Sequence, residues 1–414
     1  MGIFFKKKPD RAEKKPERTE GGELLFCLPS TTDELLAPLE ALFHVETGKK
    51  GNWITLRRSD RPDMVLTFAA FGLNDEGERS EYAKQQLQGI QGFYRRVETQ
   101  HKDVKLNLLY HLRQCKGVIQ VHYEMAGTDK EEFLFPVLQA VRALGGLVTW
   151  SGGTSILNGD GRMILDQRGA SQVEYYMPVE QVPPPDFGGD LPPACRQRRD
   201  QSVELLRQRH IYVTPWLPLL EDRDTPARTV REICGRAGAL LVVSLYSECR
   251  LGEKMDYQAA KDFVQGVTEA YHAEEFFSPK ERAYLDDPDS TEQAQIQFAW
   301  QYENLWVMEW ALGLLDTLPW PDQICDVPAS ARIMREHPSL EALEQAAELR
   351  EVRDLLDMAD LIYRTDWACV DARVMGLDAP AGLDSGVVQE RHRALFWLAG
   401  CDHCCGWDDV DLST

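Results

Sequence analysis

The chain has 414 residues, of which 43% are hydrophobic and 27% charged, and its formal net charge at pH 7 is −21. One hydrophobic core rarely supports a chain of this length, so we expect two domains. No apolar stretch is long enough to cross a bilayer, and the negative charge opposes contact with phosphate backbones. These totals exclude a transmembrane protein and make nucleic acid an unexpected partner.

Residues 1–22 are predicted to form a disordered basic leader, because the first twenty hold seven Lys and Arg against four acidic residues. Their short apolar run precedes the lysines, which reverses the order of a secretory signal, so we predict a cytoplasmic location. The run is one weak membrane anchor, and Lys6 stands where a myristoylation signal has Ser or Thr. Membrane contact through this leader is the less favoured alternative.

Residues 23–178 alternate short β-rich runs with helical spacing. Strands are predicted in "ELLFCLP", "NWITLRR", "MVLTFAAFG", "GVIQVHYEM", "GLVTWSG" and "RMILDQ", and helices in "TTDELLAPLEALF", around Tyr82–Phe93, and in "EEFLFPVLQAVRALG". This order gives two tandem β-α-β-β units, which would form an antiparallel sheet with helices on one face, an α+β domain. The glycine-rich "SGGTSILNGDG" lacks a Walker lysine, and we interpret residues 158–161 as a hairpin turn.

Residues 179–200 hold five prolines and no apolar period, which is typical of a linker. Residues 201–414 are predicted to form an all-helical domain of about seven helices. Thr225 and Pro226 are a helix start signal, and Ser278 with Glu281 forms a predicted capping box. The run that follows Ser339 is long enough for one helix or for two with a bend.

Ten cysteines without export should be reduced thiols, and Cys27, Cys234 and Cys369 lie in apolar settings typical of core residues. A denser cluster ends the chain, where the possible metal or redox residues are Cys401, His403, Cys404 and Cys405. A structural zinc site normally needs a second C-x-x-C pair, and the chain has no other. A thioredoxin-like cysteine pair lies at the start of a helix, whereas this pair follows a predicted helix. We therefore favour a helix end with reduced thiols near Trp407, and we predict no metal and no cofactor.

Glu303 lies in the middle of an apolar face of "IQFAWQYENLWVMEWALGLLD", and Glu309 lies on a second apolar face. A carboxylate between tryptophans loses its hydration, and the free-energy cost is offset only if a cation or a backbone donor pairs with it. Two interpretations stay open for Glu303. It is either a structural acid paired with an arginine or a pocket acid with a raised pKa.

Two further predicted helices hold charged residues that could lie near Glu303. Arg364 can pair with Asp360 along its helix or reach across to Glu303, and Glu390 and Arg391 lie on a third predicted helix. These side chains could converge on a polar centre, or they could form interhelical ion pairs.

Four motifs in order, "WQYENLWVMEWALGLLDTLPWPDQICD", "DLIYRTDWACVDARVMG", "VVQERHRALFWLAG" and "WDDVDLST", resemble the bacterial family catalogued as domain of unknown function 4272. The resemblance covers roughly residues 200–414 and implies a mostly helical domain, with no established reaction or ligand. The cysteine cluster lies in a segment that the family pattern leaves variable. The positions that match the motifs are Glu303, Trp310, Asp360, Arg364, Trp367, Arg373, Glu390, Arg391, Trp397, Trp407, Asp408 and Asp409.

No recognisable catalytic signature occurs, so three hypotheses remain. The first is a protein-binding, adaptor or immunity-like module whose acidic helical domain contacts another protein. The negative charge of the chain favours a basic partner. The second is an enzyme that acts on a small anionic substrate at Glu303, Arg364, Glu390, Arg391 and Asp408. The third is a metal or thiol-redox role of the C-terminal cysteine cluster. Pocket geometry discriminates between the first two, because catalytic carboxylates face an open cleft and structural ones are paired in a closed core.

Overall fold

The computed structural model describes residues 19–29, 45–50, 53–58, 65–126, 130–150, 154–179, 192–401 and 406–414. The chain divides into two compact units, residues 1–183 and 184–414. The division falls within the proline-rich segment 179–200. Most of the predicted leader and the predicted helix "TTDELLAPLEALF" lie outside the described residues.

The first unit contains an eight-stranded antiparallel sheet with the strand order β2-β3-β4-β5-β1-β6-β7-β8. This confirms the α+β class and the antiparallel sheet. Two strands were not predicted, because β2 carries few apolar residues and β7 has only three residues. The strands are β1 (Thr19–Leu28), β2 (Val45–Lys50), β3 (Trp53–Arg58), β4 (Val65–Gly72), β5 (Gly117–Ala126), β6 (Leu147–Trp150), β7 (Ser155–Leu157) and β8 (Met163–Asp166).

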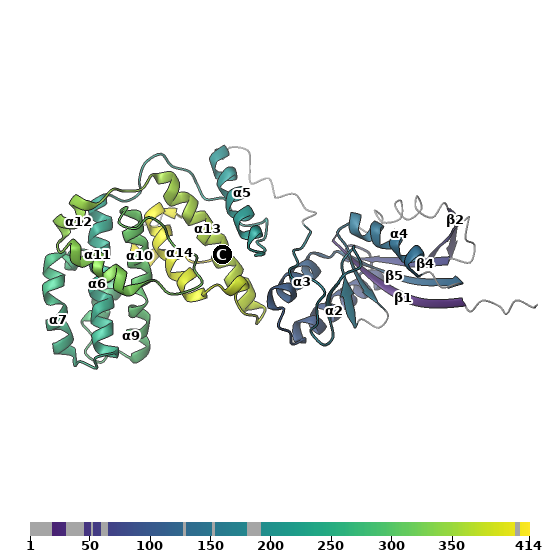
Figure 1. Ribbon diagram of the computed structural model, residues 1–414, viewed down its shortest axis with the longest axis horizontal. Helices are drawn as coiled ribbons and strands as arrows, with labels where there is room; N and C mark the ends of the chain where they lie inside the picture. Colours follow the sequence, from purple (N-terminus) through teal and green to yellow (C-terminus); the bar gives the residue numbers. More distant parts are fainter. Residues whose placement is uncertain are drawn as a thin grey trace, which may run out of the picture. The chain divides into compact units, whose positions relative to one another are not determined.

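Helices cover both faces of the sheet (Figure 1): α2 (Glu78–Arg96) and α3 (Lys102–Gln114) follow β4, and α4 (Lys130–Ala143) follows β5. Val137 and Val141 of α4 pack in one core with Phe26 and Ile119 of the sheet. On the opposite face, the hydroxyl of Tyr82 in α2 donates a hydrogen bond to the side chain of Gln120. The predicted placement of helices on one face was therefore wrong. Residues 24–28 of β1 and most residues of β4 are apolar on both sides of the strand, so both faces of the sheet need cover.

The predicted turn at residues 158–161 joins β7 to β8. The side-chain oxygen of Asn158 accepts hydrogen bonds from the backbone N–H groups of Asp160 and Arg162. Gly161 has a φ of 75°, a conformation that glycine adopts without steric cost. The glycine-rich segment is a hairpin connection, as predicted.

The described residues of the second unit form ten α-helices and no strand, which confirms the all-helical prediction. More helices occur than the seven expected, since α8, α9 and α12 are short. The helices are α5 (Pro193–Gln208), α6 (Val230–Leu251), α7 (Tyr257–Ala270), α8 (Pro279–Leu285), α9 (Glu292–Ala299), α10 (Gln301–Ala311), α11 (Val327–Glu336), α12 (Leu340–Ala346), α13 (Val352–Val374) and α14 (Ser385–Ala399).

Several predicted boundaries need correction. β1 begins at Thr19, inside the predicted leader, and α5 begins at Pro193, inside the predicted linker 179–200. Proline is tolerated there because the first helical N–H has no partner to lose. The long run after Ser339 is two helices, of which α12 is capped by that serine. The capping box of α6 uses Thr229 and Glu232 instead of Thr225, one turn later than predicted.

Helix α10 is buried on all sides: each of its eleven residues is buried. It packs against α6 and α14, and α14 packs along α13 (Figure 1). A helix in this position has no solvent-facing side, so its charged residues must be neutralised inside the core. In the part of the chain that the structure describes, no helix has both the length and the apolarity needed to span a membrane.

A buried ion pair ties α6 to α8. The Nη2 atom of Arg236 lies 2.5 and 2.6 Å from the two carboxylate oxygens of Glu281, and both side chains are at most 3% exposed. The same carboxylate accepts the backbone N–H of Ser278, so the predicted capping box of α8 is present. The Trp407 ring lies beneath the Arg236 guanidinium at 4.8 Å. Glu281 therefore caps α8 and neutralises the buried charge of Arg236 on α6.

We predict that Glu281→Gln lowers the free energy of unfolding of the helical unit by about 3–5 kcal/mol, because it leaves the Arg236 charge buried and unpaired. Urea unfolding followed by tryptophan fluorescence measures this, since eight of the ten tryptophans lie in residues 184–414. The control is Asp286→Asn, which removes an exposed pair with Lys261 and should cost at most about 1 kcal/mol. Equal effects of the two changes would refute the structural role of the buried pair.

Glu309 on α10 is a buried carboxyl that pairs with no cation among the described residues. The hydroxyl of Ser330 donates to its Oε1 at 2.8 Å, whereas Oε2 has no hydrogen-bond partner among the described residues. Burial raises the pKa of Glu309 to about 8, and the hydrogen bond from Ser330 opposes this shift. The folded protein therefore holds this proton through a pH range in which the unfolded chain releases it.

This difference predicts a specific pH dependence. As the pH rises from 4.5 to about 8, the folded protein loses stability at this site, by up to about 1.4 kcal/mol for each pH unit. Glu309→Gln should remove that slope, so the variant gains stability relative to the natural protein as the pH rises. Unfolding free energies measured between pH 4.5 and 9 test this. Parallel curves for the two proteins would show that Glu309 titrates normally.

Candidate functional site

The predicted pocket acid Glu303 forms a buried ion pair between α10 and α14. Its Oε2 lies 3.2 Å from Nε of Arg391, and the two side chains are 2% and 3% exposed. Its Oε1 accepts the backbone N–H of Cys325, and the Arg391 guanidinium also donates to the carbonyl of Pro319 at 2.5 Å. Both carboxylate oxygens are thus engaged, as the structural interpretation of Glu303 requires.

Glu390 lies close to this pair. It accepts a hydrogen bond from the side chain of Asn304 at 2.8 Å and forms an ion pair with Arg393 at 3.4 Å. Burial raises the pKa of Glu390, and the negative charge of Glu303 acts in the same direction, whereas Arg393 and Asn304 lower it. The structure therefore brings together three of the five predicted site residues, Glu303, Glu390 and Arg391, at the α10–α14 contact.

The other two predicted site residues do not join them. Arg364 binds both oxygens of Asp360, one turn earlier on α13, at 2.8 and 2.9 Å. Asp408 accepts the backbone N–H of Lys280 in the first turn of α8, where unpaired N–H groups favour a carboxylate. The five side chains do not all converge on one polar centre. Of the alternatives that the sequence left open, Arg364 adopts the ion pair with Asp360 on its own helix, and Asp408 caps α8.

The remaining motif positions mainly pack helices together. The Arg350 guanidinium lies 4.8 Å from the Trp310 ring, and Arg228 lies 4.6 Å from the Trp397 ring. Trp397 and Trp407 meet edge to face at 5.6 Å. Trp367 contacts Tyr212, whereas Arg373 and Asp409 are exposed.

Sequence reasoning missed several buried polar groups. Arg198 of α5 binds Asp222 at 2.7 Å and Asp357 of α13 at 3.0 Å. His392 of α14 contacts Asp366 of α13 at 2.7 Å. A lone charge inside an apolar run, such as Arg236 in "ICGRAGALL", is the signal that could have indicated such pairs.

Next to the Glu303 pair, an open groove of about 270 Å³ lies between the C-terminal end of α6, α9 and α10, and the start of α11. Its walls are mostly apolar, and two of its isoleucines, Ile296 and Ile324, are 39% and 62% exposed. The residues that line the groove are Glu248, Leu251, Ile296, Ala299, Trp300, Tyr302, Glu303, Ile324, Cys325 and Val327.

The exposed charge of this groove is Glu248. Its carboxylate accepts a hydrogen bond from the hydroxyl of Tyr302 at 2.8 Å and forms no ion pair with the described residues. Glu303 is neutralised from behind by Arg391, and burial raises the pKa of the Cys325 thiol, which favours the neutral form. The groove therefore presents apolar walls and one accessible negative charge, and it can hold an aliphatic chain that ends in a cation.

The C-terminal cysteine cluster is only partly described. Cys401 is buried after the end of α14, and His403, Cys404 and Cys405 lie outside the described residues. Within the described ranges, no three His, Cys, Asp or Glu side chains are grouped to hold a metal ion. Burial raises the pKa of Cys234 and of Cys369 to about 12, which favours the protonated thiol over the nucleophilic thiolate.

Comparisons with known proteins give one match. The profile of a family described as a domain of unknown function (DUF4272) matches residues 198–410, just over half of the chain. Neither the curated proteins nor the solved structures contain a match. The matched range covers the buried ion pairs and the groove, and the chain belongs to the DUF4272 family.

Proposed function

We propose that this protein is a protein-binding module, and that the groove beside α10 receives an apolar segment of a partner that also carries a lysine or arginine. The observation that carries the proposal is the composition of the groove. Apolar walls with two exposed isoleucines surround the single accessible carboxylate of Glu248.

The open shape of the groove favours a protein partner. Pockets for small molecules bury most of the ligand, whereas this groove of about 270 Å³ would leave much of a small ligand exposed to water. An exposed apolar patch of this kind is typical of interaction surfaces. It can hold one or two side chains that protrude from a larger surface, with the aliphatic stem of a lysine or arginine along Ile296 and Ile324.

The charge of the helical unit favours a basic partner. Residues 184–414 hold 42 acidic and 22 basic residues, a surplus of 20 negative charges, which is nearly all of the net charge of the chain. The four buried arginines are already bound to carboxylates. The remaining negative field steers a basic partner toward this unit and weakens with added salt.

The enzyme alternative has less support. A catalytic acid needs an oxygen free to exchange a proton with the substrate. Both oxygens of Glu303 are bound, and Arg364 and Arg391 are each held by a carboxylate. An anionic substrate at this site would have to displace a buried ion pair.

The test uses two exposed aliphatic residues, of which one lies in the groove. A photo-crosslinking residue is placed at Ile324, and at Val374 as the matched control, which is 71% exposed and lies outside the groove. We expect a specific adduct from position 324 in cells, in which the linked peptide contains apolar residues next to Lys or Arg, and none from position 374.

Binding of the purified partner then gives the size of the effect. Ile324→Gln should raise its Kd at least about tenfold, and Val374→Gln should leave it unchanged. The proposal fails if position 324 gives no adduct, if the linked peptide carries no basic residue, or if both glutamine variants bind alike.

A further inference from the structure

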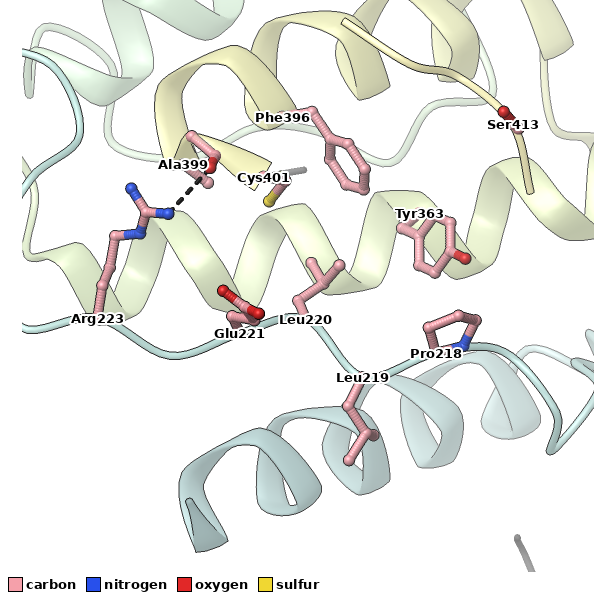
Figure 2. A pocket seen from close by; sticks show the side chains of 11 residues that line it. Pro218, Leu219, Leu220, Glu221, Arg223, Tyr363, Phe396, Ala399, Cys401 and Ser413 are labelled. Atoms are coloured by element: carbon pink, nitrogen blue, oxygen red, sulfur yellow. Dashed lines mark hydrogen bonds between the residues drawn. The ribbon is translucent and has the colours of Figure 1, made fainter. Parts of the chain in front are cut away.

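A second, more enclosed pocket of about 240 Å³ lies elsewhere in the helical unit. Figure 2 shows it between residues 218–223, which we call the strap, and the side chains of α13 and α14. Its lining also includes Tyr363 of α13, Phe396 of α14, residues 399–401 at the end of α14, and Ser413. It shares no residue with the groove.

Arginine side chains hold the strap in place. Arg364 donates to the carbonyl of Pro218 at 3.2 Å, and Arg198 donates to the carbonyl of Leu220 at 3.5 Å. Arg198 also binds Asp222, and Arg223 donates to the carbonyl of Gly400 at 2.9 Å. Because the strap is fixed along its length, the pocket is preformed, which lowers the entropic cost of binding a ligand.

Arg223 differs from the four buried arginines of this unit. Each of those forms an ion pair with a carboxylate, whereas Arg223 has no carboxylate within 4.0 Å among the described residues. Its Nε atom is buried and has no hydrogen-bond partner there. Because Nε is buried, a ligand would reach the guanidinium through its other nitrogens, and an anion there would compensate a charge that no described carboxylate pairs with.

The pocket also carries a negative site. The Glu221 carboxylate forms no ion pair with the described residues, and Figure 2 shows it on the side of the strap that faces Cys401. Ala399 and Gly400, at the C-terminal end of α14, line the same cavity. The carbonyls of Trp397 and Gly400 at this helix end already accept hydrogen bonds from Arg228 and Arg223. The negative charge open to a ligand is therefore the Glu221 carboxylate, which favours a cation beside it.

Apart from Ser413 and the hydroxyl of Tyr363, the other side chains of the wall are apolar. Leu220 of the strap extends toward the rings of Tyr363 and Phe396, whereas the side chain of Leu219 points away from them (Figure 2). An anion site, a cation site and an apolar wall thus lie within a space of about 240 Å³. Such a space holds a molecule smaller than the usual drug-sized ligand.

We propose that this pocket binds a small zwitterion, namely a free α-amino acid with an apolar side chain. The carboxylate of the ligand binds the guanidinium of Arg223, and its ammonium group lies beside the Glu221 carboxylate. Its side chain packs against Phe396 and Tyr363. This site is separate from the groove and does not depend on the function proposed for it.

Isothermal titration of the full chain with L-phenylalanine and L-leucine tests the proposal. The matched probes are 3-phenylpropionate, which lacks the ammonium group, and phenethylamine, which lacks the carboxylate. We expect at least one amino acid to bind with a measurable Kd, and both analogues of phenylalanine to bind at least about tenfold more weakly than phenylalanine. The absence of heat from both amino acids up to about 10 mM, or equal binding of an analogue, overturns the proposal.

Variants assign the two charges. Glu221→Gln changes an exposed side chain and should weaken amino-acid binding about tenfold without loss of fold. Arg223→Gln should abolish binding, whereas Arg228→Gln is its control, since Arg228 also donates to a carbonyl at the end of α14 but does not line the pocket. If Arg223→Gln fails to fold, Leu220→Trp, which fills the cavity, should still abolish binding. Unchanged binding in Glu221→Gln and Leu220→Trp would place the ligand elsewhere.

Discussion

A guanidinium placed in a protein core costs several kcal/mol unless a carboxylate lies beside it, and the helical unit buries four of them. Three of the four pairs join different elements: Arg198 joins α5 to α13, Arg236 joins α6 to α8, and Arg391 joins α14 to α10. The fourth, Arg364, is paired within α13 and donates to the strap. Separating one of these pairs would leave a charge buried without its partner, so the pairs favour the helix contacts that the structure shows.

Two groups of charged residues in the helical unit differ in role: those in buried ion pairs hold the helices together, and others, which form no ion pair with the described residues, lie at the proposed binding sites. Most of the family motif residues are committed to ion pairs, cation–π contacts or helix caps, so they explain the fold better than they explain an activity. Three charged side chains at these sites form no ion pair with the described residues: Glu248 in the groove, and Arg223 and Glu221 in the strap pocket. The first site offers a negative charge with apolar walls, and the second offers both signs of charge. Both proposed sites are therefore positioned by the same helical bundle, but their charged residues are not among those whose ion pairs hold it together.

The sequence predicted the class of both units because strand alternation, helical spacing and caps such as Ser278 and Ser339 are local signals. It could not settle the partner of Arg364, since an arginine four residues after an aspartate is also within reach of a neighbouring helix. The burial of Glu303 was visible from the tryptophans around it, but its partner lies 88 residues away on α14. The groove and the strap pocket were not predicted, because both depend on the paths of irregular segments, around Ile324 and around Leu220, that carry no periodicity.

We interpret the polar residues between α10 and α14 as structural, and we propose the neighbouring groove as the binding site. A double-mutant cycle with Glu303→Gln and Arg391→Met tests this role most directly. If the pair is a closed structural one, each single change destabilises the helical unit by about 3–5 kcal/mol, and the double variant loses less than the sum by at least about 2 kcal/mol. If the two effects add and Glu303→Gln leaves stability unchanged or higher, Glu303 is a site acid, and a structural role for the pair is contradicted.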